Sequence, residues 1–95
     1  MKIKIESLGL PALAKLIGKK TEIDLPAGTV ADLVAFLTKR HGREMQKALL
    51  DNDGKLDLTI QVMLNEEGIL NRDQYSKRVL KDGEKVIFMI LVGGG

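Results

Sequence analysis

Three consecutive glycines, Gly93, Gly94 and Gly95, close the sequence and are its best candidate for chemistry. Glycine has the greatest backbone freedom and no side chain to pack, so folding gives no reason for three of them after an apolar segment. An extended glycine tail can enter a narrow channel in which any Cβ atom would clash. The pattern therefore predicts that the carboxylate of Gly95 is delivered into the active site of another protein.

Other residue patterns offer little chemistry. The chain has no cysteine and a single histidine, His41, which excludes thiol chemistry, disulfides and a multi-histidine metal site within one copy. Residues 51–54 have the composition of a calcium loop, but taking Gly54 as the turn glycine puts Leu49 and Ile60 at ligand positions. We expect no metal, no cofactor and no catalytic constellation, and hence no independent enzyme.

Composition indicates one small globular protein. The 95 residues are 44% hydrophobic and 29% charged, and the net charge of +2 is weak evidence for a nucleic-acid partner. The longest apolar run, residues 86–92, is far too short to cross a membrane. The first six residues alternate in charge and lack a signal-peptide core. We expect a cytoplasmic protein that binds neither nucleic acid nor membrane.

Hydrophobic periodicity predicts the elements that would position the tail. Alternating apolar and polar residues predict strands at 2–6, 20–25, 58–64 and 85–91, with a short edge strand around 69–70. Thr29 followed by Asp32 resembles a capping box, and apolar residues at helical spacing then run to Gly42. A shorter helix is expected at 43–50, and residues 8–18 are expected to form a loop with one helical turn.

The order of these elements predicts a ubiquitin-like β-grasp fold of the α+β class. We expect a mixed sheet of about five strands, with one main helix packed on one face and a second short helix. The first and last strands should lie parallel in the middle of the sheet. Residues 1–92 would form the domain, and residues 93–95 a flexible tail. A frayed end would also be rich in glycine, but its position directly after the last strand favours a functional tail.

The last predicted strand is apolar on both faces, although one helix covers only one of them. Ile87, Met89 and Leu91 share the face away from the helix, and Met63 of the preceding long strand joins them. A strand that is apolar on both faces is usually covered on both. These four residues are therefore candidates for a partner-binding face, and cover by loops of the same chain is the alternative.

The end of the chain resembles the MoaD/ThiS family, which comprises the small subunit of molybdopterin synthase and the sulfur carrier of thiamine synthesis. The resemblance rests on an Asp-Gly-Glu turn at 82–84, an apolar strand and a Gly-Gly end taken together. Residues 65–75 are similar to the thiamine carrier, whereas the front half with its second helix is more like the molybdopterin subunit. Gly93 departs from the family, in which a larger residue commonly precedes the glycine pair.

The resemblance implies a carrier mechanism. A ubiquitin-activating-enzyme-like adenylyltransferase would attach AMP to the carboxylate of Gly95, and a persulfide sulfur donor would convert the adenylate to a thiocarboxylate. An acceptor synthase subunit would receive the sulfur, with residues 93–95 entering its site. Chain length and the second helix favour the molybdopterin type over the thiamine type. If the natural chain continues past Gly95, a protease would first have to expose the glycines.

Two other functions use the same features. A ubiquitin-like protein modifier would join the Gly95 carboxylate to a lysine as an isopeptide. A non-catalytic β-grasp module would only bind a partner protein. A thiocarboxylate on the free protein, as opposed to higher-mass conjugates, distinguishes the carrier from the modifier.

Overall fold

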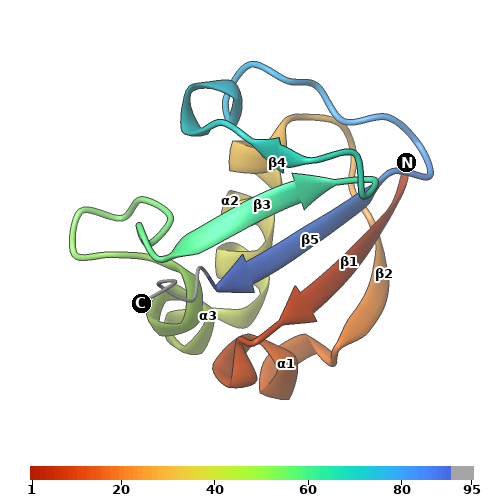
Figure 1. Cartoon of the computed structure of the whole chain (residues 1–95). Coiled ribbons are helices and arrows are strands. Elements are labelled where there is room, and N and C mark those ends of the chain that lie inside the picture. Colours follow the sequence, from red (N-terminus) through yellow and green to blue (C-terminus); the bar gives the residue numbers. More distant parts are fainter. Residues whose placement is uncertain (91–95) are drawn as a thin grey trace.

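A computed structural model describes residues 1–90 of the chain (Figure 1). In chain order its elements are β1 (Lys2–Leu8), α1 (Pro11–Ile17), β2 (Lys20–Asp24), α2 (Val30–His41), α3 (Arg43–Leu49), β3 (Ile60–Leu64), β4 (Ile69–Leu70), the 3₁₀ helix η1 (Arg72–Gln74) and β5 (Lys85–Ile90). The predicted strands, the main helix and the second short helix are all present. None of the described helices is long and apolar enough to cross a membrane.

The five strands form one mixed sheet in the order β2-β1-β5-β3-β4. The predicted parallel pairing of the first and last strands is confirmed, with Ile5 beside Val86 at the centre. All other neighbours are antiparallel. The segment with the most apolar residues therefore occupies the middle of the sheet, where both of its edges are hydrogen-bonded.

Helix α2 begins and ends where the sequence predicts. The Thr29 side chain accepts a hydrogen bond from the Asp32 amide at 3.3 Å, and the Asp32 carboxylate accepts one from the Thr29 amide at 2.9 Å. This reciprocal capping box satisfies two of the amides that a helix start leaves without partners. At the other end, Gly42 takes a φ of 69° and its amide donates to the carbonyl of Thr38.

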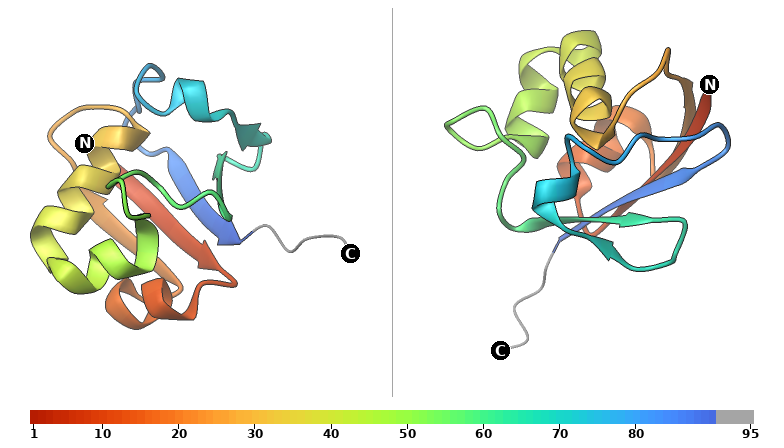
Figure 2. Two further views of the ribbon diagram at one scale, coloured as in Figure 1. Left: turned by 90° about the vertical axis from the view of Figure 1, so that its left-hand side faces the viewer. Right: turned by 90° about the horizontal axis from the view of Figure 1, so that it is seen from above.

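The hydrophobic core lies between α2 and one face of the sheet, with all three helices on that side (Figure 2). The residues buried to 0–1% exposure include Ile3, Ile5, Leu13, Val30, Leu33, Leu37, Met45, Leu49, Val62, Val86 and Phe88. They come from both ends of the sequence. The other face of the sheet is toward the viewer in Figure 1, and no helix within residues 1–90 crosses it.

Residues 8–18 are more helical than the sequence predicts. Instead of a loop with one turn, α1 has seven residues and starts with Pro11, whose fixed φ suits a first helical position. Leu13 anchors it in the core at 0% exposure. The amide of Gly18, which has a φ of 84°, donates to Ala14 and ends the helix.

The third strand starts two residues later than predicted. Leu58 was expected beside Ile60 on the core face, but it lies outside β3 and is 73% exposed. The reason is local, since the Asp57 carboxylate accepts hydrogen bonds from the amide and hydroxyl of Thr59 at 2.8 and 2.7 Å. The Ile60 amide then donates to the Asp57 carbonyl. This side-chain-stabilised turn interrupts the alternation of an extended strand.

Candidate functional site

The predicted tail, Gly93, Gly94 and Gly95, and the predicted face residue Leu91 lie outside the described residues. The structure describes the folded domain that precedes these residues, in which β5 ends at Ile90. Three features of this domain bear on function. They are the turn that enters β5, the polar network around Glu84, and the sheet face opposite α2.

The turn before β5 fixes the first strand beside the last. The Asp82 carboxylate accepts a hydrogen bond from the Lys2 amide at 2.6 Å, and the Gly83 amide donates to the Lys2 carbonyl at 2.7 Å. Two residues on, the Lys4 amide donates to the Glu84 carbonyl at 3.0 Å. Gly83 has a φ of 85°, a left-handed conformation that side chains disfavour. The Asp-Gly-Glu turn thus sets the register of the parallel central pair.

Glu84, the last residue of the Asp-Gly-Glu turn, has a structural role that the turn motif alone does not indicate. It is 9% exposed, and its carboxylate accepts four hydrogen bonds. Arg78 donates two, at 3.0 and 2.7 Å, while the Asn65 amide group and the Lys81 backbone amide each donate at 2.7 Å. The oxygen of the same Asn65 side chain accepts from the Lys85 amide at 2.8 Å. One carboxylate therefore joins the β3–β4 hairpin to the start of β5.

This environment strongly favours the ionised carboxylate. Hydrogen bonds from Arg78 foremost, with further ones from Lys81 and Asn65, lower the pKa of Glu84 to about 2, against the opposing effect of burial. The shift reflects structural hydrogen bonding to the charged form. A permanently ionised carboxylate is poorly suited to accept and return a proton near neutral pH, so Glu84 is a positioning group.

The sheet face opposite α2 carries an apolar patch centred on β5. Strand register pairs Ile87 with Met63 of β3, and Met89 with Leu8 of β1. Ile69 of β4 pairs with Met63 from the far side. We call these five residues the outer-face patch. Leu8 and Ile69 are 49% and 50% exposed, Met63 and Met89 are half-buried, and Ile87 is only 3% exposed.

The structure thus brings together Met63, Ile87 and Met89, as predicted, and adds Leu8 and Ile69. Ile87 forms the floor of the patch, because it is only 3% exposed. A partner would contact its neighbours instead. Leu8 could have been found from the sequence, because it continues the alternation that begins at Lys2.

An ion cluster borders the outer-face patch on the side away from the end of β5. The Lys85 ammonium lies 3.0 Å from a Glu6 oxygen and 3.1 Å from a Glu66 oxygen. Hydrogen bonds to Glu6 first, and then to Glu66, raise the pKa of Lys85. Apolar surface is therefore concentrated toward the end of β5 that leads into the tail.

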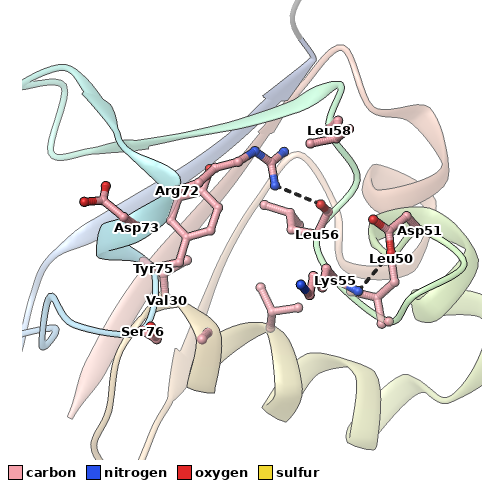
Figure 3. Close-up of a pocket in the computed structure, with 13 residues that line it drawn as sticks. Val30, Leu50, Asp51, Lys55, Leu56, Leu58, Arg72, Asp73, Tyr75 and Ser76 are labelled. Carbon is pink, nitrogen blue, oxygen red and sulfur yellow. Dashed lines mark hydrogen bonds between the residues drawn. The ribbon is translucent and has the colours of Figure 1, made fainter.

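A cavity of about 650 Å³ lies between α2 and the segment before β3 (Figure 3). Val30, Val34 and Tyr75 contribute to its walls. Arg72 reaches over Tyr75 and donates to the carbonyls of Leu56, Asp57 and Ile60 at 3.0, 2.7 and 3.3 Å. The guanidinium thus has a structural role, holding the loop that precedes β3.

Within residues 1–90, no three histidine, cysteine, aspartate or glutamate side chains are arranged to hold a metal ion. What the described part offers is a five-stranded sheet with an apolar patch on the face opposite α2. A mixed sheet of this order packed on one main helix is the ubiquitin-like β-grasp fold. The class is therefore that of small ubiquitin-like proteins.

Within that class the chain belongs to the ThiS family, whose family model matches residues 12–95. The resemblance to the MoaD/ThiS family of ubiquitin-like sulfur carriers is thereby confirmed. No curated protein matches the sequence.

Solved structures with the same fold span the whole chain. The small archaeal modifier protein SAMP1 of Haloferax volcanii is 21% identical, with a TM-score of 0.75 and complete coverage of both chains. Urm1 of Trypanosoma brucei is 24% identical, with a TM-score of 0.71 over 99% of this chain and 95% of its own. A complex of the two subunits of molybdopterin-converting factor from Helicobacter pylori contains a chain that is 17% identical, with a TM-score of 0.62 and complete coverage of both.

Proposed function

We propose that this protein is a sulfur carrier whose working group is the carboxylate of Gly95. The family match carries the proposal, because it continues through residue 95 and so includes the glycines as well as the folded support. The chain itself has no cysteine, so the sulfur comes from a donor protein. The carrier supplies a carboxylate and a docking surface, and its partners supply the catalytic side chains.

The chemistry begins with activation of a poor electrophile. The Gly95 carboxylate attacks the α-phosphate of ATP on a ubiquitin-activating-enzyme-like adenylyltransferase, which forms an acyl adenylate and releases pyrophosphate. The terminal sulfur of a protein persulfide then attacks the acyl carbon, and AMP leaves. A thiol of the partner cleaves the resulting S–S bond, which yields a protein disulfide and the thiocarboxylate on Gly95.

The outer-face patch is proposed as the surface that holds the partner while the tail reacts. Leu8 and Ile69 offer exposed apolar area on either side of the central strand. Leu91, in the sequence immediately after β5, continues the alternation of Ile87 and Met89 and is proposed as part of the same surface. Apolar contacts of this kind would orient the carrier, and residues 93–95 would extend into the partner's channel.

Among the possible acceptors we propose a synthase subunit of the molybdopterin type over the thiamine type. The proposal rests on the chain length and on α3, the second helix that follows α2 directly. Thiocarboxylated chain mixed with a molybdopterin-type large subunit should transfer sulfur faster than with a thiazole synthase. A faster reaction with the thiazole synthase would reverse this assignment and leave the carrier chemistry intact.

Intact-protein mass spectrometry tests the central proposal. The chain is incubated with the adenylating enzyme of its own host, ATP and a persulfide donor. We expect a product heavier by ~16 Da, the difference between sulfur and oxygen at the acyl carbon, located at Gly95 by fragmentation. Gly95→Ala, which adds a Cβ where the channel is narrow, should lower the yield strongly. An unchanged mass with all components active would exclude the carrier function.

A protein modifier is the second candidate, favoured by the similarity to the Haloferax protein named as a modifier. A modifier would form the same adenylate but transfer the acyl group to a lysine amine. In host lysate, antibodies against the chain would then detect conjugates of higher mass that Gly95→Ala eliminates. Conjugates without any thiocarboxylate would assign the chain to this class.

A further inference from the structure

Among residues 1–90, β2 forms one edge of the sheet and pairs only with β1. The Leu25 amide donates to the Met1 carbonyl at 2.8 Å, and the Ser7 amide donates to the Lys19 carbonyl at 2.9 Å. In an antiparallel pair, alternate residues face the partner strand. The backbone groups of the odd-numbered residues of β2 therefore face β1, and those of the even-numbered residues, with Glu22 in the middle, point away from the sheet.

A groove of about 470 Å³ runs alongside this open edge, between β2 and the C-terminal ends of α1 and α2. Half-buried apolar side chains line it, namely Leu16, Ile17 and Ile23. Arg40 and His41 stand at its helix side, and neither is in an ion pair among the residues that the structure describes. We call this feature the edge groove.

We propose that the edge groove binds an extended segment of a partner protein, which adds to β2 as a further strand. The open carbonyls and amides of the edge would supply backbone hydrogen bonds, and the groove would receive every second side chain. Side chains opposite Thr21 and Ile23 enter the groove, because these residues share the core face of the sheet. In the groove, apolar side chains of the bound segment would pack against Leu16 and Ile17, and a carboxylate of the segment would pair with Arg40.

The side chains of the bound segment that point away from the groove also have a preferred chemistry. Side chains opposite Glu22 and Asp24 lie on the outer face of the sheet, where these carboxylates are exposed. A lysine or arginine at that position would form a cross-strand pair with Glu22. The segment therefore alternates apolar or acidic residues toward the groove with polar or basic residues outward.

A second copy of this chain is the alternative occupant of the edge. If two β2 strands paired antiparallel along all five residues, Glu22 would lie opposite Glu22, and Lys20 of each copy would lie opposite Asp24 of the other. One like pair is then set against two opposite pairs, so the outward charges do not select between the two occupants. Toward the groove, however, a second β2 offers only Thr21 and Ile23 and brings no carboxylate to Arg40, whereas an acidic segment supplies one.

The edge groove is separate from the surface proposed for sulfur transfer. It opens on the helix side of the sheet at β2, whereas the outer-face patch lies on the opposite face over β1, β5 and β3. A protein bound at the edge groove would leave the outer-face patch accessible. The inference goes beyond the proposed function, because it gives the carrier a second, simultaneous binding partner.

Titration of the ¹⁵N-labelled full chain with the synthetic peptide acetyl-Thr-Ile-Lys-Val-Thr-Asp-amide tests the inference. This peptide has the required alternation, and a control peptide of the same composition, acetyl-Ile-Val-Thr-Thr-Lys-Asp-amide, does not. We expect saturable amide shifts limited to residues 16–24 and 40–41, and at least fivefold weaker binding of the control. Shifts on the outer-face patch, no shift at millimolar peptide, or concentration-dependent dimerisation through β2 would overturn the proposal.

Two pairs of variants test the contacts separately. Glu22→Pro removes an outward amide without breaking a bond to β1, and it should weaken binding about tenfold, the effect of one or more lost hydrogen bonds. Glu22→Ala keeps the amide and should change affinity less than about threefold. Arg40→Glu should weaken binding about fivefold, whereas Lys39→Glu, one residue earlier, should not. Equal effects within either pair would contradict strand addition at this site, and Arg40→Glu remains informative if Glu22→Pro fails to fold.

Discussion

Glu84 joins its own turn to the β3–β4 hairpin, because its carboxylate accepts hydrogen bonds from Arg78, from the backbone of Lys81 and from Asn65, which lies 19 residues earlier. Glu84→Gln would keep the shape but leave Arg78 partly buried without its counter-charge. We expect a loss of about 2–3 kcal/mol in the free energy of unfolding. Urea denaturation followed by circular dichroism measures it. The exposed Glu44→Gln serves as control and should change stability by less than about 0.5 kcal/mol.

The same carboxylate predicts a pH dependence with a definite sign. The pKa of Glu84 is about 2 in the folded protein, below its ordinary value of 4.5. A lowered pKa in the folded state adds stability that is fully present above the unfolded value and is lost as pH falls through the folded value. The stability difference between wild type and Glu84→Gln should therefore be constant from pH 7 to about 5 and shrink toward pH 2. A difference that stays constant down to pH 2 would refute this role.

Alanine substitutions at Gly9 and Gly54 would distinguish the cost of backbone strain from the cost of steric overlap. Both have positive φ, 69° and 77°, but a Cβ on Gly9 would lie 2.8 Å from the Ile90 Cγ2 atom, whereas nothing lies within 4 Å at Gly54. Gly54→Ala should cost about 1 kcal/mol for the left-handed backbone alone. Gly9→Ala should cost about 1–2 kcal/mol more because of overlap. Thermal unfolding measures both, and in an Ile90→Ala background the extra cost of Gly9→Ala should disappear.

At the scale of the elements, the start of α2 is set by a local signal in the sequence, the capping box. Since the hydrogen bonds of Thr29 and Asp32 are reciprocal, Thr29→Ala or Asp32→Ala should each cost about 1 kcal/mol. The double variant should cost clearly less than the sum, because either change already breaks the box. A double-mutant cycle in urea measures this coupling. Strict additivity would mean that the two side chains act independently.

Elements whose signals lie within a few neighbouring residues could be predicted from the sequence. The capping pair Thr29 and Asp32 and the period-two strands are of this kind, and the structure reproduces them. Leu58 was assigned to a strand because its apolar character continues that of Ile60. The Asp57 carboxylate redirects the backbone there, and such side-chain turns compete with regular structure in ways that periodicity does not register.

The candidate site was predictable only where its members alternate along one strand. Met89 and Met63 follow from such alternation, and the structure places both on the outer face. The burial of Ile87 depends on flanking strands, one of them from the start of the chain. The partners of Glu84 include Asn65, which lies 19 residues away. Neither long-range effect has a signal in the local sequence.

At the scale of the whole molecule, the two proposed surfaces should act independently. Met63→Glu puts a charge into the outer-face patch and should lower the rate of thiocarboxylation by at least about tenfold, as desolvated charges do in apolar interfaces. Ala35→Glu, on the exposed side of α2, introduces the same charge elsewhere and should have little effect. Peptide that saturates the edge groove should leave the rate within about twofold, because it touches neither surface used by the partner. Equal sensitivity to Met63→Glu and Ala35→Glu would remove the outer-face patch from the partner-binding surface.

The parallel pairing of β1 with β5 also has a consequence for synthesis of the protein. Of the five described strands, the central one is made last, so a nascent chain cannot close its core until residues 85–90 have left the ribosome. A product truncated before Lys85 would lack the strand that joins β1 to β3 and would expose apolar edges to proteases. Every folded copy therefore contains β5, the segment that precedes the glycines in the sequence.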